Sequence, residues 1–193
     1  MPRVKTFDQV EVLDRAVDLF WKQGYAATSV QDIVNHLGIN RASLYDTYGD
    51  KEQLFRKAIE KYCSVNGQSI SDFLDAQANV REGIQNLFDR AINESFSDED
   101  RKGCFVVNTA TELIPGDEYA LNLATNNQKS FEAMFLNYLE RGKANGQIKT
   151  EANLKTVASL LFTLYNGIKV VGKAKKNKAE MKRTISLALS ILD

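Results

Sequence analysis

The sequence has little proline, histidine or cysteine, and each scarcity narrows what the protein can be. Two prolines occur among 193 residues, at positions 2 and 115, which favours long uninterrupted helices. The single histidine, His36, and two cysteines without zinc-ligand spacing provide no metal site. The sequence also contains no Gly-rich phosphate loop and no nucleophile elbow. We therefore expect neither an enzyme nor a bound cofactor.

Long apolar runs are also missing. The most apolar stretch, residues 157–171, is interrupted by four polar or charged residues, and the first twelve residues lack the apolar core of a secretion signal. We therefore expect a cytoplasmic protein with no membrane partner. In that compartment Cys63 and Cys104 are expected to be free thiols.

The formal net charge is zero, because 25 basic residues balance 25 acidic ones. The balance is uneven along the chain: the net charge is −1 over residues 1–60, −4 over 61–168 and +5 over 169–193. The overall balance argues against a polycation that coats nucleic acid. We interpret the basic C-terminal stretch as helix ends and a solvated loop.

Apolar residues recur at helical spacing along the chain, and no strand-like alternation persists, so the sequence predicts an all-α protein. The fourth predicted helix begins at Lys51 and has no clear end, because Gly67 and Ser71 interrupt its pattern. The other predicted helices cover about residues 7–23, 30–37, 41–48, 80–95, 104–113, 119–145, 153–175 and 178–192.

Residues 24–50 show the start and stop signals of two short helices. Thr28 or Ser29 can cap the first, Gly38 ends it, and Asn40 can cap the second. Two short helices joined by a turn that contains glycine describe a helix-turn-helix unit.

Several motifs in residues 7–60 resemble the N-terminal DNA-binding domain of the tetracycline-repressor (TetR) family of transcriptional regulators. They are LFxxxGY from Leu19, TSVxDI from Thr28, LGI from Leu37, SLY from Ser43 and YGDKExLF from Tyr48. Their order and spacing are those of the family. The rest of the chain is similar to the family only in helical layout and length.

The resemblance implies a helix-turn-helix domain over residues 1–48 and a ligand-binding and dimerisation domain over 49–193, linked by the helix that starts near residue 50. Arg41 would read a guanine edge in the major groove, Lys51 would bind a phosphate, and Arg3 and Lys5 would form an arm. Tyr48 would pack in the core. The predicted DNA-binding residues are Thr28, Asn40, Arg41, Ala42, Ser43, Tyr45 and Lys51.

The second domain is predicted to hold an unknown small-molecule effector. The net charge of −4 over residues 61–168 favours a neutral or cationic effector over an anionic one. An ordinary core has the same mixture of aromatic and polar residues and is the alternative interpretation. The predicted lining residues are Phe105, Asn108, Glu112, Phe131, Met134, Phe135, Tyr138, Phe162 and Tyr165.

Cys104 opens a short apolar helix directly after Gly103. A helix N-terminus lowers the pKa of a thiol, and Arg101 and Lys102 add positive charge nearby. The segment is similar to one in family subgroups that sense electrophiles through a cysteine. Two hypotheses remain for Cys104, a thiol sensor or a packing residue.

The last two predicted helices have more apolar residues than one core face requires. This surplus predicts a homodimer through both helices, and a central helix buried on two sides is the alternative. The predicted function is a ligand-responsive transcriptional regulator that binds a near-palindromic double-stranded DNA operator. The resemblance implies repression as the usual outcome, and activation is the alternative. A helical adaptor or small-molecule carrier that has lost DNA binding is the alternative, favoured by the acidic Asp46 on the predicted recognition helix.

Overall fold

The computed structural model describes residues 7–174 and 177–193, so Arg3, Lys5, Lys175 and Lys176 lie outside the described part. Every regular element in these two ranges is a helix, as predicted. The α-helices are α1 (Gln9–Gln23), α2 (Val30–Leu37), α3 (Arg41–Tyr48), α4 (Lys51–Asp75), α5 (Val80–Ser97), α6 (Phe105–Leu113), α7 (Glu118–Ala144), α8 (Leu154–Val171) and α9 (Lys178–Leu189). Short 3₁₀ turns, η1 (Gly172–Ala174) and η2 (Ser190–Leu192), follow the last two.

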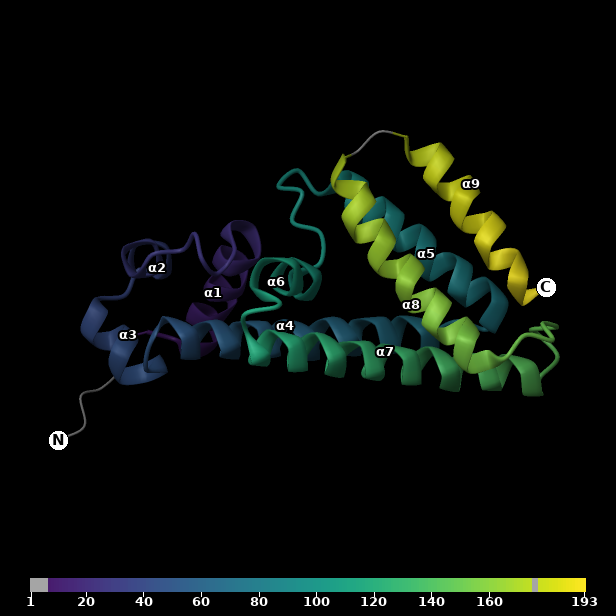
Figure 1. The fold of residues 1–193 in the computed structure, drawn as a ribbon, viewed down its shortest axis with the longest axis horizontal. Helices are drawn as coiled ribbons and strands as arrows, with labels where there is room; N and C mark the ends of the chain where they lie inside the picture. Colours follow the sequence, from purple (N-terminus) through teal and green to yellow (C-terminus); the bar gives the residue numbers. More distant parts are fainter. Residues whose placement is uncertain (1–6, 175–176) are drawn as a thin grey trace.

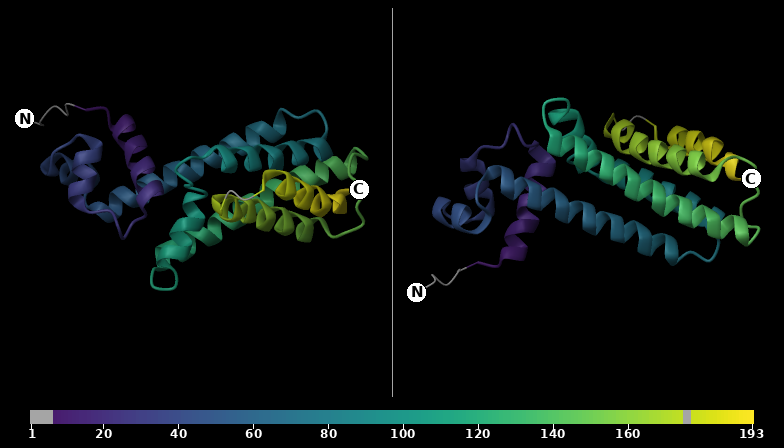
Figure 2. Two further views of the ribbon diagram at one scale, coloured as in Figure 1. Left: turned by 90° about the horizontal axis from the view of Figure 1, so that it is seen from above. Right: turned by 60° about the horizontal axis from the view of Figure 1, so that its bottom comes forward.

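The long helices α4 and α7 run side by side and form the spine of the molecule (Figure 1). α1, α2 and α3 gather at one end of α4, whereas α5, α8 and α9 form a bundle toward the other end (Figures 1 and 2). α6 lies between the two groups and contacts both α4 and α7. This position makes α6 a bridge between the helix-turn-helix and the bundle.

Two hydrophobic cores hold these groups together, and α4 contributes to both. Its first half places Phe55 and Ile59 in the core under α1–α3, and its second half places Ile70 and Leu74 in the core of the bundle. Phe105 of α6, only 1% exposed, also belongs to the first core. The first core therefore extends beyond residue 48 and includes buried residues of α4 and α6.

Local capping explains why the short helices begin and end as predicted. The Asn40 side chain accepts a hydrogen bond from the Ser43 N–H at 2.8 Å and caps α3. Gly38 ends α2 in the left-handed conformation, with φ of 67°. The end of α4 lacked such a signal in the sequence. α4 continues through Gly67 to Asp75 because Ile70 and Leu74 are anchored in the bundle core.

One expectation about apolar segments needs correction. Residues Leu154–Ala174 form a helix that is long and apolar enough, by length and composition, to cross a membrane. One such helix is weak evidence for a membrane span, because core helices of soluble proteins pass the same test. Only 28% of its most apolar window is buried within the chain, so this helix has a substantial uncovered apolar face.

Candidate DNA-binding surface and effector clefts

The turn before α2 is fixed by a capping box. Ser29 accepts a hydrogen bond from the Asp32 N–H at 3.1 Å, and the Asp32 carboxylate accepts one from the Ser29 N–H at 2.8 Å. Of the two cap candidates in the sequence, Ser29 is therefore the cap of α2 and Thr28 is not. Thr28 is 1% exposed, and its hydroxyl donates to the Gly24 carbonyl at 2.6 Å. Its role is to fix the turn between α1 and α2.

The first turn of α3 exposes polar groups on one face, while the opposite face of the helix is anchored in the core. Arg41 and Ala42 are exposed and Ser43 is half-buried, whereas Leu44 on the opposite face is fully buried. The Tyr48 hydroxyl donates to the Gln9 carbonyl at 3.1 Å, which confirms that Tyr48 packs in the core. Because this anchor holds α3 against α1, its outer face is free to enter a groove of a duplex.

Two further residues predicted to bind DNA flank this surface. Tyr45 is 49% exposed on α3. Lys51 is half-buried at the start of α4, where its Nζ lies 4.3 Å from the centre of the Tyr25 ring. Burial lowers the pKa of Lys51, and the Glu112 carboxylate partly opposes that change. Asp46 is exposed on the same helix as Tyr45.

α6 and the loop before it connect the bundle to α1. The Glu112 carboxylate accepts hydrogen bonds from the backbone N–H groups of Tyr25 and Ala26, at 3.0 and 2.6 Å. The Lys102 ammonium lies 2.9 Å from the Asp18 carboxylate and 4.8 Å from the centre of the Trp21 ring. These contacts join residues more than eighty positions apart.

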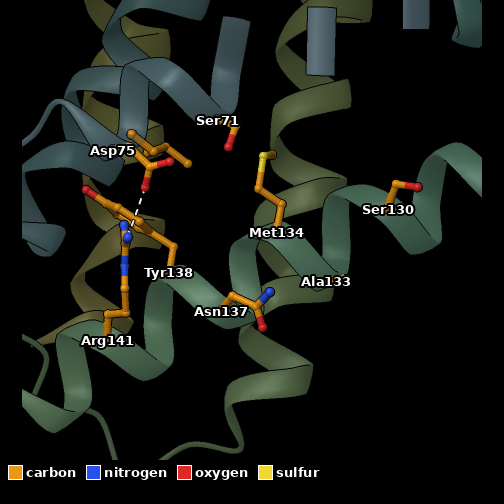
Figure 3. Close-up of a pocket in the computed structure, with 9 residues that line it drawn as sticks. Ser71, Asp75, Ser130, Ala133, Met134, Asn137, Tyr138 and Arg141 are labelled. Carbon is orange, nitrogen blue, oxygen red and sulfur yellow. Dashed lines mark ion pairs between the residues drawn. The ribbon is translucent and has the colours of Figure 1, made fainter. Parts of the chain in front are cut away.

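Two adjoining clefts lie between α4 and α7, with volumes of about 420 and 440 Å³. Ser71, Ser130 and Met134 line both of them. Figure 3 shows the first cleft, closed at one end by the ion pair between Arg141 and Asp75, whose charged atoms are 2.9 Å apart. The walls combine hydroxyl and amide groups with apolar surface, as in sites for small organic ligands.

The structure brings five of the nine predicted pocket residues to clefts. Met134 and Tyr138 line the first α4–α7 cleft, and Phe131 lines the second. Phe162 and Tyr165 join Phe131 around a small cavity of about 10 Å³ beside Cys104.

The other four predicted pocket residues have different surroundings. Phe105 and Phe135 are core residues with 1% and 0% exposure. Asn108 donates to the Lys102 carbonyl at 2.7 Å, and Glu112 binds the turn after α1.

Sequence reasoning missed the polar walls of the α4–α7 clefts. On α4 they are small residues at helical spacing, Ser64, Gly67 and Ser71, and on α7 they include Asn127, Ser130 and Asn137. The residues of each series lie on one face of their helix, so the periodicity of small and polar residues is the sequence signal that could indicate these walls. Apolar periodicity alone does not reveal these positions.

Cys104 is half-buried at the N-terminus of α6, and its sulfur lies 3.9 Å from the Tyr62 hydroxyl. Burial raises the pKa of the other cysteine, Cys63, to about 12. Both the sensing and the packing hypotheses for Cys104 fit this geometry.

The uncovered apolar face of α8 continues onto α9. A groove of about 540 Å³ lies between the two helices and is walled by residues such as Leu164, Val171 and Met181. Leu187 of α9, an apolar side chain, is 76% exposed. An uncovered surface of this kind marks an interaction site.

A tight helix-turn-helix with an exposed polar first turn, mounted on a helical bundle with clefts, defines a DNA-binding regulator. Residues 12–58 match the model of bacterial regulatory proteins of the tetR family, and residues 80–188 match that of the tetracyclin repressor-like C-terminal domain. The chain therefore belongs to the TetR family. It is a DNA-binding, ligand-responsive transcriptional regulator.

Individual relatives agree with this assignment. The uncharacterized HTH-type transcriptional regulator YezE of Bacillus subtilis (strain 168) is 33% identical over 194 residues, which cover 100% of both chains. The HTH-type transcriptional repressor ComR of Escherichia coli (strain K12) is 27% identical, over 87% of this chain and 80% of ComR. A cysteine mutant of the TetR family transcriptional regulator CifR, solved with double-strand operator DNA, has a TM-score of 0.87 at 28% identity, covering 99% and 100% of the two chains.

Proposed function

We propose that the chain is a cytoplasmic repressor that binds a near-palindromic operator as a homodimer. The exposed first turn of α3 carries this proposal, because its buried anchor presents Arg41, Ala42 and Ser43 outward. The names of ComR, a repressor, and of the CifR complex with operator DNA support it. Residues 1–48 form the DNA-binding part, residues 49–193 the ligand-binding and dimerisation part, and α4 the link.

In this arrangement Arg41 donates to guanine O6 and N7, which are the acceptors that an arginine fork fits in the major groove. Lys51, Tyr45 and the capped start of α3 at Asn40 contact phosphates and position the helix. Thr28 acts indirectly, by holding the turn before α2.

The homodimer forms through α8 and α9. The apolar groove between them and the exposed Leu187 support this, because a twofold pairing would cover both surfaces at once. A twofold dimer places two α3 helices about 34–36 Å apart, which matches successive major grooves on one face of the duplex.

The effector binds in the clefts between α4 and α7. A ligand there contacts α4 at Ser71, on the helix that also carries the first core. An effector that binds more strongly to one of two positions of α4 would shift the protein toward that position. The spacing of the two α3 helices would change with it, and so would the affinity for the operator.

Footprinting with the full-length protein on the DNA upstream of its own reading frame tests this function. The expected result is protection of one near-palindromic site at low salt, with weaker binding to a scrambled duplex of equal length. The absence of any preferred duplex would instead favour the adaptor or carrier with Asp46 on its former recognition helix.

A further inference from the structure

A separate cleft of about 220 Å³ lies where α1, the loop between α5 and α6, and the end of α8 meet. It shares none of its walls with the two clefts between α4 and α7. The charged residues in its wall are the cations Arg101, Lys102, Lys169 and Lys173 and the carboxylates Glu94 and Asp98.

The two carboxylates already have partners. The Glu94 carboxylate lies 2.7 Å from the Arg90 guanidinium and 3.0 Å from the Lys169 ammonium. Although burial raises the pKa of Glu94, hydrogen bonds from Arg90 and Lys169 lower it overall, so the group is a carboxylate at neutral pH. Asp98 accepts hydrogen bonds from the backbone N–H groups of Lys102 and Gly103, at 2.5 and 3.4 Å.

Two of the cations have no carboxylate partner within residues 7–174 and 177–193. The Lys173 ammonium donates to a neutral amide oxygen, Asn108 Oδ1, at 2.7 Å. Arg101 is exposed, and its backbone is held at a positive φ of 53°. The wall therefore has an excess of positive charge on two neighbouring elements.

The same wall contains two buried donors that lack a hydrogen-bond partner in the described part of the chain. They are the Ser95 hydroxyl, on a residue only 8% exposed, and the indole N–H of Trp21. Buried polar groups are almost always satisfied by protein or by something bound, so each exception calls for an explanation.

We propose that this cleft binds a small oxyanion, such as a phosphate or carboxylate group. Arg101 and Lys173 supply charge, and Ser95 and Trp21 supply hydrogen bonds. Charge-assisted hydrogen bonds of this kind are stronger than those between neutral groups. The anion would connect α1 to the loop before α6. The proposal concerns binding to the protein alone and does not depend on operator binding.

The molecule contains its own reporter for this site, because Trp21 is its single tryptophan. Full-length protein is titrated with inorganic phosphate and, separately, with succinate, at constant ionic strength maintained with sodium chloride. Tryptophan fluorescence and the indole N–H signal in NMR are followed. A saturable change is expected with at least one of the two anions, and the one that binds distinguishes phosphate from carboxylate chemistry.

Three variants locate the effect. Ser95→Ala should weaken anion binding about tenfold or more, because a hydrogen bond to a charged group is lost. Arg101→Asn removes an exposed charge while Asn tolerates a positive φ, and it should weaken binding about two- to fivefold. Lys129→Gln removes an exposed cation of α7 that is not part of this wall, and it should leave the affinity unchanged.

A cooperative thermal transition and an unchanged circular dichroism spectrum would show that the variants fold. Ser95→Ala should melt at the same temperature or higher without anion, because it removes an unpartnered hydroxyl. The proposal is overturned if neither anion gives a saturable change, or if both Ser95→Ala and Arg101→Asn bind as the unmodified protein does. Arg101→Asn alone decides the matter if Ser95→Ala does not fold.

Discussion

The Glu112 carboxylate accepts a hydrogen bond of 2.6 Å from the backbone N–H of Ala26 and so attaches α6 to the turn after α1. Gly24 makes this close approach possible. A Cβ atom at position 24 would lie 2.8 Å from Glu112 Oε2, and the backbone has φ of 83° and ψ of 171°, a region that only glycine enters readily. The turn and the carboxylate therefore depend on each other.

Gly24→Ala should destabilise the protein by about 1–3 kcal/mol, because it adds both backbone strain and contact with Glu112. Glu112→Ala should cost about 1 kcal/mol through two lost hydrogen bonds at a partly solvated site. Urea unfolding followed by circular dichroism measures both.

The double variant separates the two causes. Glu112→Ala removes the contact but leaves the strain, so Gly24→Ala should cost less in that background and still destabilise. An equal cost in both backgrounds would mean that the two residues do not interact.

Lys51→Ala should weaken binding to every duplex to a similar degree, because a phosphate contact carries no sequence information. The logarithmic dependence of affinity on salt should become shallower by about 1 for each protomer. Fluorescence anisotropy over a salt series measures this slope. Lys129→Gln, an exposed change on α7, is the matched control and should leave the slope unchanged.

Arg41→Ala should act differently and reduce discrimination at one base pair of each half-site, by about 1–3 kcal/mol. Competition between the operator and single-base variants shows this directly. A uniform loss on all duplexes would mean that Arg41 contacts only the backbone.

Leu187→Glu should convert the homodimer to a monomer, because it places a charge on an exposed apolar position at the proposed interface. Sedimentation velocity measures the mass. Glu140→Gln, an exposed change on α7, should leave it unchanged. A dimer that survives Leu187→Glu together with Val171→Glu would place the interface elsewhere.

Alkylation should modify Cys104 before Cys63. Burial raises the pKa of Cys63 to about 12, so this thiol stays protonated and unreactive at pH 8. Mass spectrometry after brief treatment with iodoacetamide should show one adduct in the Cys63→Ser variant and none in Cys104→Ser. If alkylation of Cys104 leaves operator binding intact, the sensing hypothesis is wrong and Cys104 only packs.

The local parts of this fold could be read from the sequence. Asn40 and Gly49 bracket α3, and both bounds were predicted, because a cap and a stop signal act within a few residues. The end of α4 could not be predicted, since packing of Leu74 in a distant core overrides the weak helix formers before it.

The contrast between local signals and long-range packing also explains which site residues can be predicted from the sequence. Arg41 and Tyr45 follow from a local motif with known spacing. The sequence does not show that Glu112 binds the turn after α1, because its partners Tyr25 and Ala26 lie more than eighty residues away and only the folded chain brings them together. The cleft proposed to bind an oxyanion cannot be predicted from the sequence either, because its wall is assembled from three separate segments.

The placement of Phe105 limits how the DNA-binding domain can be transferred between regulators of this family. This side chain completes the core beneath α1–α3, although it lies more than fifty residues after α3 ends. A fragment cut anywhere within α4 would expose the aromatic cluster that Phe105 forms with Trp21, Phe55 and Tyr62. A chimera that transfers the DNA-binding domain of this protein to another regulator must therefore include α6. Otherwise the other regulator must supply an aromatic side chain at the position of Phe105.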